Sequence, residues 1–235
     1  MSTLYLEPFS GLSGDMLNAL LLDLGADRKH LEEALKTISL DGYHLHVDRI
    51  AKSSIWGTDF DVHMEHGEKD HGIAGDFDHH HDHDHEHEHH HHHHEHEHTH
   101  SHHHHHGEVR GLKEIETIIL SSGVSDFVKE KSLEVFRDIA QAEANVHQMP
   151  VEEIHFHEVG ATDSIIDIMS FFILWETLDI DAVYSTAVTE GSGTITVAHG
   201  VMPVPVPAVM QLRLQTAIPF SQDFDIHTEL VTPTG

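Results

Sequence analysis

A histidine-rich tract interrupts the chain near its middle and limits what can fold around it. Twenty of the residues from Asp78 to His106 are histidine, and most of the others are Asp or Glu. A segment with almost no apolar side chains cannot offset the entropy lost on ordering, so we expect residues 67–107 to be a disordered insert in the metal-free protein. The folded part is then expected to be one domain made of residues 1–66 and 108–235, long enough for a real core.

The tract has the chemistry of a metal store. Imidazole nitrogen suits nickel, zinc and copper, and the interspersed carboxylates raise the local negative charge. A disordered chain with many donors binds several ions weakly and with little selectivity, so it does not form a geometry-selective catalytic site. The alternatives without a metal function are a solvated low-complexity insert or a cloning tag. A tag is disfavoured because the run is internal and is interrupted by Asp and Glu. Ligands expected in the tract include His79, His80, His81, His90, His92, His94, His103 and His105.

Composition narrows the classes of partner. The chain carries 12 basic and 41 acidic residues, a formal net charge of −29, which repels nucleic acid and anionic membranes and attracts cations. It has no cysteine, so any metal must be held by imidazole, carboxylate, carbonyl or water. The start of the chain lacks the pattern of a signal peptide, and the apolar run from Ile165 to Trp175 is too short to span a membrane. We therefore expect a cytoplasmic protein.

Hydrophobic periodicity predicts alternating strands and helices. The pattern favours an α/β (or α+β) fold around one mixed sheet. Residues 43–50 and 57–65 alternate apolar and polar side chains and are expected to form a hairpin or meander. The other strands are expected at 3–7, 182–191 and 193–200, and residues 154–160 are expected to form a short strand or an extended loop. Helices are expected at about 15–24, 28–38, 112–123, 126–147 and 161–178, and a proline-led helix at the end of 201–215.

The stretch IHFHEVGATDSIIDIMSFFILW, residues 154–175, predicts a second and more specific metal site. On a helix, Asp163 and Asp167 share one face, and the surrounding positions are almost all apolar. A buried carboxylate must be compensated by a metal ion, a basic partner or backbone N–H groups, and basic residues are scarce here. A first-turn Asp163 also suits a helix N-terminus without any metal. The expected ligands or polar substrate contacts are His155, His157, Glu158, Asp163 and Asp167.

Weaker candidates lie in three loops. The sequence FSGLSGDM, residues 9–16, follows a strand and opens a helix, which is the setting of an anion site, and Asp15 can reach a phosphate through a divalent ion. A tight turn with Ser13 or Asp15 as helix cap explains the same residues, and without a P-loop lysine the loop does not support a nucleotide hydrolase. His199 is a candidate ligand, although a lone loop histidine is more often not one. The turn containing Thr232 and Thr234 suits a substrate-binding loop, but such turns are common.

Four ordered motifs resemble one known family. FSGLSGDM, HFHEVGATDSIIDI, HGVMPVPVPAV and ELVTPTG are similar to the LarC family of nickel-pincer cofactor biosynthesis, in which an internal histidine-rich stretch is also usual. The resemblance implies a lyase-class metal insertase that loads Ni(II) into pyridinium-3,5-bisthiocarboxylic acid mononucleotide, with hydrolysis of CTP and help from Mn(II) or Mg(II). The product is the cofactor of lactate racemase-type enzymes. The absence of cysteine fits, because the sulfur ligands belong to the organic substrate.

The chain departs from that family in one respect. LarC chains continue past TPTG into a C-terminal domain linked to CTP binding, whereas this sequence stops at Gly235. We therefore expect a C-terminal LarC-like domain or polypeptide as partner, with homo-oligomerisation left open.

In this hypothesis the histidine-rich tract collects nickel, and the second predicted metal site, in residues 154–175, takes part in the reaction. Asp15, His157, Glu158, Asp163 and Asp167 would act where substrate, nucleotide phosphates and metal meet. Ser10, Gly11, Ser13, Gly14, Thr232 and Thr234 would contact the phosphates. The rival hypothesis is a non-enzymatic nickel or zinc buffer, or a metallochaperone, that acts through the tract alone.

Overall fold

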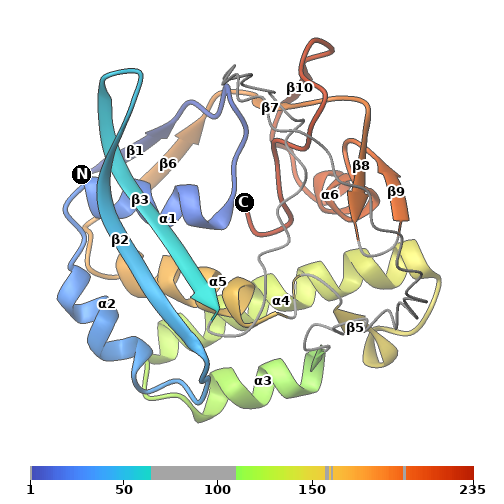
Figure 1. The fold of residues 1–235 in the computed structure, drawn as a ribbon. Coiled ribbons are helices and arrows are strands. Elements are labelled where there is room, and N and C mark those ends of the chain that lie inside the picture. Colours follow the sequence, from blue (N-terminus) through green and yellow to red (C-terminus); the bar gives the residue numbers. More distant parts are fainter. Residues whose placement is uncertain (1, 65–109, 157–158, 160, 198–199) are drawn as a thin grey trace, which may run out of the picture.

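The computed structural model describes residues 2–64, 110–156, 159, 161–197 and 200–235 (Figure 1). The expected histidine-rich insert at 67–107 lies outside these residues. Helices and short strands alternate along the described chain, which confirms the α/β class. No helix within the described ranges is long and apolar enough to cross a membrane.

One helix, α5 (Thr162–Trp175), lies at the centre of the fold. It packs against α1 (Gly14–Asp23), α2 (Arg28–Leu35) and α4 (Asp126–His147). Its apolar residues point in several directions because neighbours surround it. Ile165, Ile166, Met169 and Ile173 have no exposed surface. The sequence-based expectation that this helix is buried is therefore confirmed, and most of the main core forms around it.

A long β-hairpin, β2 (Tyr43–Lys52) and β3 (Ile55–Met64), covers one side of α1 (Figure 1). The two turn residues, Ser53 and Ser54, both have positive φ, the backbone of the tight turns that match strand twist. Directly opposite residues share one face, so Val47 and Phe60 enter the core together. The alternating pattern of 43–50 and 57–65 thus predicted this hairpin correctly.

The remaining strands pair in twos, so the expectation of one mixed sheet was wrong for the part of the chain that is described. Strands β1 (Thr3–Leu6) and β6 (Ala182–Ser185) run parallel, as do β7 (Val188–Glu190) and β10 (Phe220–Gln222). The antiparallel pairs are β4 (Arg110–Gly111) with β5 (His155–Phe156) and β8 (Thr194–Val197) with β9 (Gly200–Pro203). These strands have two to four residues each, and helix packing around α5, not a central sheet, buries most of the apolar surface.

Two further helices complete the frame: α3 (Leu112–Ser121) and the proline-led α6 (Pro207–Leu214), both packed on α4. A single 3-10 turn, Val151–Glu153, leads into β5. A second, small core forms from Val188, Val209 and Val231, which come from β7, α6 and the last residues of the chain. This small core packs the last residues of the chain against β7 and α6.

Candidate functional site

The loop before α1 is joined to the last residues of the chain by backbone hydrogen bonds. The N–H of Leu12 donates to the carbonyl of Leu230 (2.9 Å), and the N–H of Thr232 donates to the carbonyl of Leu12 (3.1 Å). Gly11 has a φ of 90°, and a Cβ placed on it would stand 2.0 Å from the Leu230 carbonyl oxygen. Only glycine tolerates both that backbone and that approach. Gly11, the first glycine of FSGLSGDM, therefore allows the loop before α1 to approach the end of the chain.

Gly14, the first residue of α1, marks the point where three segments meet. A Cβ placed on it would lie 3.1 Å from the Cβ of Asp167, 3.2 Å from its Oδ2 and 3.1 Å from Oγ1 of Thr234. The structure thus brings together three residues that the sequence singled out in separate motifs. The N-terminus of a helix carries partial positive charge, which favours a carboxylate or a phosphate at this place.

Hydroxyl and carboxylate groups surround this helix end. Oγ1 of Thr232 and Oγ1 of Thr234 are 3.0 Å apart, and the Ser13 hydroxyl donates to the carboxylate of Asp15. Ser13 occupies the N-cap position, but its side chain makes no capping hydrogen bond to the helix backbone. The expectation of a capping side chain there was wrong, because the hydroxyl turns to Asp15 instead. Ser10 lies exposed in the same loop.

Asp163 and Asp167 both lie partly buried on α5, as their spacing predicted. Asp163 Oδ1 accepts a hydrogen bond from the N–H of Ser164 (2.8 Å), which fits a first-turn acid. His155 lies elsewhere, on β5, with its ring beside Gly111 at the start of α3. His157, Glu158 and His199, like the histidines of the tract, lie outside the described residues.

Within the described ranges, no three His, Asp or Glu side chains are arranged to hold one metal ion. The five-ligand cluster stays a prediction, since Asp163 and Asp167 lie on one helix, His155 lies on β5, and the other two residues lie outside the described part of the chain. Asp167 lies beside the N-terminus of α1 and the hydroxyl of Thr234, which is an arrangement suited to a phosphate and a divalent ion together.

Two buried polar residues near this place were missed by the sequence analysis. Asn18, fully buried on α1, donates from Nδ2 to the carbonyl of Asp167 (3.1 Å) and thereby ties α1 to α5. Glu190, 1% exposed, accepts through Oε1 from the N–H groups of Gly191 (2.7 Å), Leu230 (2.7 Å) and Val231 (3.3 Å). The only sequence signal for Glu190 was an acid at the end of an apolar strand, followed by glycine.

Glu190 has a positional role that its contacts make clear. A carboxylate that accepts several backbone N–H groups fixes those groups firmly, since such charge-assisted bonds are the strong ones. By binding Leu230 and Val231, Glu190 holds the segment that also pairs with Leu12. Through these bonds to the two preceding residues, Glu190 fixes the backbone that carries Thr232 and Thr234.

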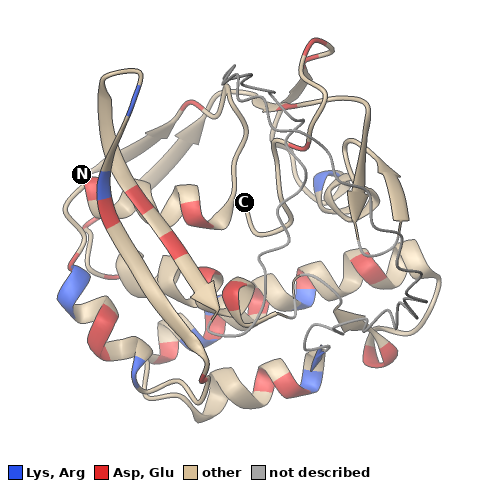
Figure 2. Ribbon diagram, viewed as in Figure 1, with Lys and Arg blue, Asp and Glu red and all other residues tan. Residues whose placement is uncertain are grey.

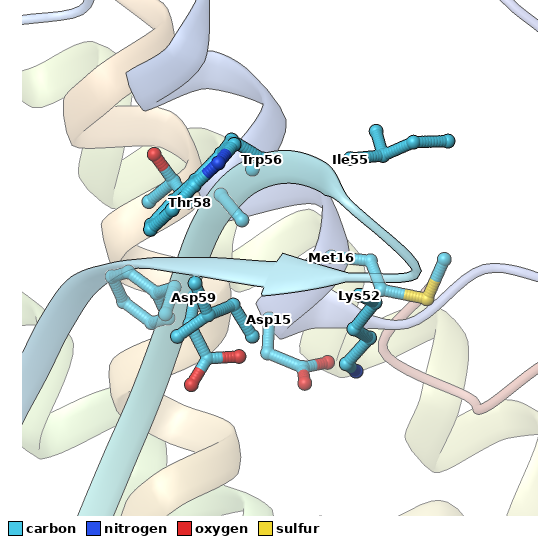
Figure 3. Close-up of a pocket in the computed structure, with 11 residues that line it drawn as sticks. Asp15, Met16, Lys52, Ile55, Trp56, Thr58 and Asp59 are labelled. Atoms are coloured by element: carbon cyan, nitrogen blue, oxygen red, sulfur yellow. The ribbon is translucent and has the colours of Figure 1, made fainter.

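A pocket of about 430 Å³ opens beside Asp15, between α1 and the hairpin (Figure 3). Apolar side chains and three charged groups line it. Figure 3 shows Asp15, Lys52 and Asp59 on the same side of the hairpin strand, whereas Ile55 points away from them. Farther along α1, burial would raise the pKa of Asp23. Hydrogen bonds from Thr58 and the charge of Arg49 outweigh that effect and hold the pKa below its usual value.

The start of α1 thus brings a helix N-terminus, hydroxyl groups and carboxylates together on an α/β frame. The family described as nickel insertion protein matches residues 4–235, so the chain belongs to this family. No solved structure matches the chain.

Named relatives agree with this assignment. A pyridinium-3,5-bisthiocarboxylic acid mononucleotide nickel insertion protein of Lactiplantibacillus plantarum is 51% identical over all 235 residues, which cover 51% of that protein. The protein of the same name from Acetivibrio thermocellus is 39% identical over 235 residues, which cover 50% of its length. A putative nickel insertion protein of Enterococcus faecalis is 65% identical over 119 residues, 51% of this chain and 36% of that protein. The chain thus spans about half the length of the curated relatives that it matches throughout.

Proposed function

We propose that this chain is the nickel-handling part of a metal insertase that loads Ni(II) into pyridinium-3,5-bisthiocarboxylic acid mononucleotide. The observation that carries the proposal is the meeting of Gly14, Asp167 and Thr234 at the start of α1, in a chain of the nickel insertion family. The names of two full-coverage relatives supply the substrate. The product would serve lactate racemase-type enzymes.

In this proposal the start of α1 receives phosphate. The N–H groups of the first helical turn, together with the Thr232 and Thr234 hydroxyls, offer donors to a nucleotide phosphate. Ser10, Gly11, Ser13 and Gly14 would complete the loop around it.

The carboxylates have a separate task. Asp15, Asp163 and Asp167 would neutralise the phosphate charge through Mn(II) or Mg(II), which prefer oxygen ligands. His155, His157, Glu158 and His199 would offer nitrogen and oxygen ligands to nickel. Because the thiocarboxylate sulfurs of the substrate are softer donors than these, nickel would leave the protein for the substrate.

The rest of the machinery belongs to the same proposal. CTP would bind with the C-terminal half, as a domain or a partner chain, since the relatives are about twice as long as this sequence. The division into a folded part, 1–66 and 108–235, and a nickel-gathering insert, 67–107, remains a prediction, as does a cytoplasmic location. The reaction would be of the lyase class.

The test replaces Asp167 by the isosteric Asn in the complete protein, with CTP, nickel and nucleotide substrate supplied. We expect insertion of nickel into the substrate to fall by about 100-fold or more, because a carboxylate that supports phosphate or metal acts directly on the reacting groups. Asp138→Asn, an exposed change on α4, is the matched control and should keep normal activity. Normal insertion by Asp167→Asn would remove Asp167 from the mechanism.

The tract favours one rival, a nickel or zinc buffer without catalytic function. Deletion of 67–107 separates the two functions. An insertase without its tract should still turn over at saturating nickel and lose rate only when nickel is scarce. A buffer should lose its whole effect on the substrate at every nickel concentration.

A further inference from the structure

The outer face of the β2–β3 hairpin carries an unbroken run of metal-ligand side chains. Three consecutive cross-strand pairs, directly opposite in the register, consist only of histidine and aspartate: His44 with His63, His46 with Asp61, and Asp48 with Asp59. Because side chains alternate along a strand, all six lie on one face, opposite to the face that holds Val47 and Phe60 in the core. Figure 2 shows acidic positions on both strands of this hairpin.

The imidazoles on this face already touch one another. The rings of His44 and His63 stack with centroids 5.2 Å apart, and the rings of His46 and His63 meet edge to face at 5.5 Å. Two carboxylates hold them: Nε2 of His46 lies 2.9 Å from Oδ2 of Asp48, and Nε2 of His63 lies 2.9 Å from Oδ2 of Asp61. No other part of the described chain gathers three imidazoles in this way.

We propose that His44, His46 and His63, with Asp61, form a nickel-binding site on the outer face of the hairpin. Two histidines separated by one residue project from the same side of a strand, and a third directly across the ladder stands about 5 Å away between Cβ atoms. Three nitrogens and one carboxylate are a donor set that suits Ni(II).

The side chains as they lie do not yet form a closed metal centre. Within the described ranges no three donor groups converge, because Nε2 of His46 and of His63 each faces a carboxylate. The side chains of His46 and His63 are 49% and 45% exposed, so they can change rotamer without disturbing the core. Binding would exchange the contacts with Asp48 and Asp61 for metal–nitrogen bonds.

The position of this site gives it a role. Met64 ends β3, and the expected insert begins at residue 67, so the His44–His63 pair lies at the end of the hairpin that precedes the insert in the sequence. At the other end of the run, Asp59 lines the same pocket as Asp15, next to the start of α1 (Figure 3). Along the hairpin, possible ligands therefore run from the end that precedes the insert in the sequence to the pocket beside Asp15. A role of the hairpin as an intermediate nickel site between the tract and the candidate site rests on the proposed function. Metal binding by the hairpin does not rest on it.

The experiment measures the occupancy of each histidine in the full chain. Diethyl pyrocarbonate acylates imidazoles that are not bound to metal, and peptide-resolved mass spectrometry reports the extent at each position while NiCl₂ is added until the tract is saturated. We expect His44, His46 and His63 to become protected together. His30 is the matched control, because its side chain is 45% exposed and lies beside the carboxylate of Glu176, and it should stay reactive.

The variant His63→Ala decides the outcome. It should weaken the nickel protection of His44 and His46 by about tenfold or more, because a direct ligand is worth at least as much as an outer-shell one. The tract should keep its own protection. The proposal is overturned if the three histidines stay reactive when the tract is saturated, or if His63→Ala leaves the protection of the other two unchanged. Protection that persists in a protein unable to insert nickel would support the hairpin site and count against the proposed function instead.

Discussion

Asp167 on α5 and Gly14 on α1 lie so close that a Cβ on Gly14 would stand 3.1 Å from the Cβ of Asp167. The two residues are more than 150 positions apart in the sequence, and Thr234 approaches the same point from the end of the chain. The absence of a side chain at position 14 is thus what allows a carboxylate and a hydroxyl to reach the start of a helix together.

Gly14→Ala should separate activity from stability. Gly14 has no positive φ, so alanine fits its backbone, and we expect the free energy of unfolding to change by no more than about 1 kcal/mol. The added methyl group must displace Asp167 or Thr234 by a few tenths of an ångström, so nickel insertion should fall by about tenfold or more. Urea unfolding and the insertion assay measure the two effects.

Gly57→Ala is the matched control for this change. Gly57, on β3, has no positive φ either, and a Cβ there would meet only Oδ2 of Asp23, at 3.9 Å. It should leave insertion normal. Equal activity of Gly14→Ala and Gly57→Ala would show that the space beside Asp167 does not matter to the reaction.

Glu190→Ala should destabilise the fold. Removal of the carboxylate leaves the buried N–H of Val231 and the partly buried N–H of Leu230 without their acceptor, at a cost of about 1–3 kcal/mol. Glu190→Gln keeps an acceptor oxygen and should lose less. The midpoint of urea unfolding measures both variants, and an unchanged midpoint in the alanine variant would refute the supporting role of Glu190.

Asp23 should make the fold sensitive to acid. Its folded pKa lies below the ordinary value of 3.8, so its contribution to stability is full above that value and is lost as the pH falls through the lower, folded pKa. Asp23→Asn should therefore be less stable than wild type at pH 7, with a gap that narrows below about pH 4. The effect should be small, because the side chain is 38% exposed and solvent screens its pairing with Arg49. A gap that stays constant from pH 7 to pH 3 would contradict this account.

Deletion of 67–107 should lower the number of nickel ions bound per chain and leave the fold in place. The described residues of the main core come from both sides of the tract. We expect the melting temperature to change by no more than about 4 °C, measured by circular dichroism. Metal analysis after equilibrium dialysis gives the stoichiometry, and an unchanged number of bound ions would rule out the tract as a store.

Local elements were well predicted from the sequence because their signals are local. The amphipathic pattern of 126–147 matches α4 at both ends, and the alternation in YHLHVDRI and GTDFDVHME matches the hairpin. The single mixed sheet was not found, because short apolar runs such as β1 and β6 fit either a continuous sheet or isolated pairs. Their pairing depends on which helices cover them.

The candidate site was predictable in its residues but not in its geometry. Asp167, Gly14 and Thr234 each stood out, yet nothing in their spacing fixes a distance between them. Their approach depends on the Leu12 hydrogen bonds and on Glu190, which carries no local signal of its role. The histidines of the hairpin were visible as polar positions of two strands. Their importance emerges only from the register, which sets His63 opposite His44.

The tight turn at Ser53–Ser54 has a consequence beyond its own two residues. Side chains on paired strands alternate, so a slip of β3 by one position would turn His63 and Asp61 toward the core and expose Phe60 and Val62 to water. An insertion of a single residue in this turn would therefore scramble the hairpin's polar surface while changing none of its histidines. The two-residue turn thus sets the register of the hairpin, and the register determines which face carries the histidine side chains.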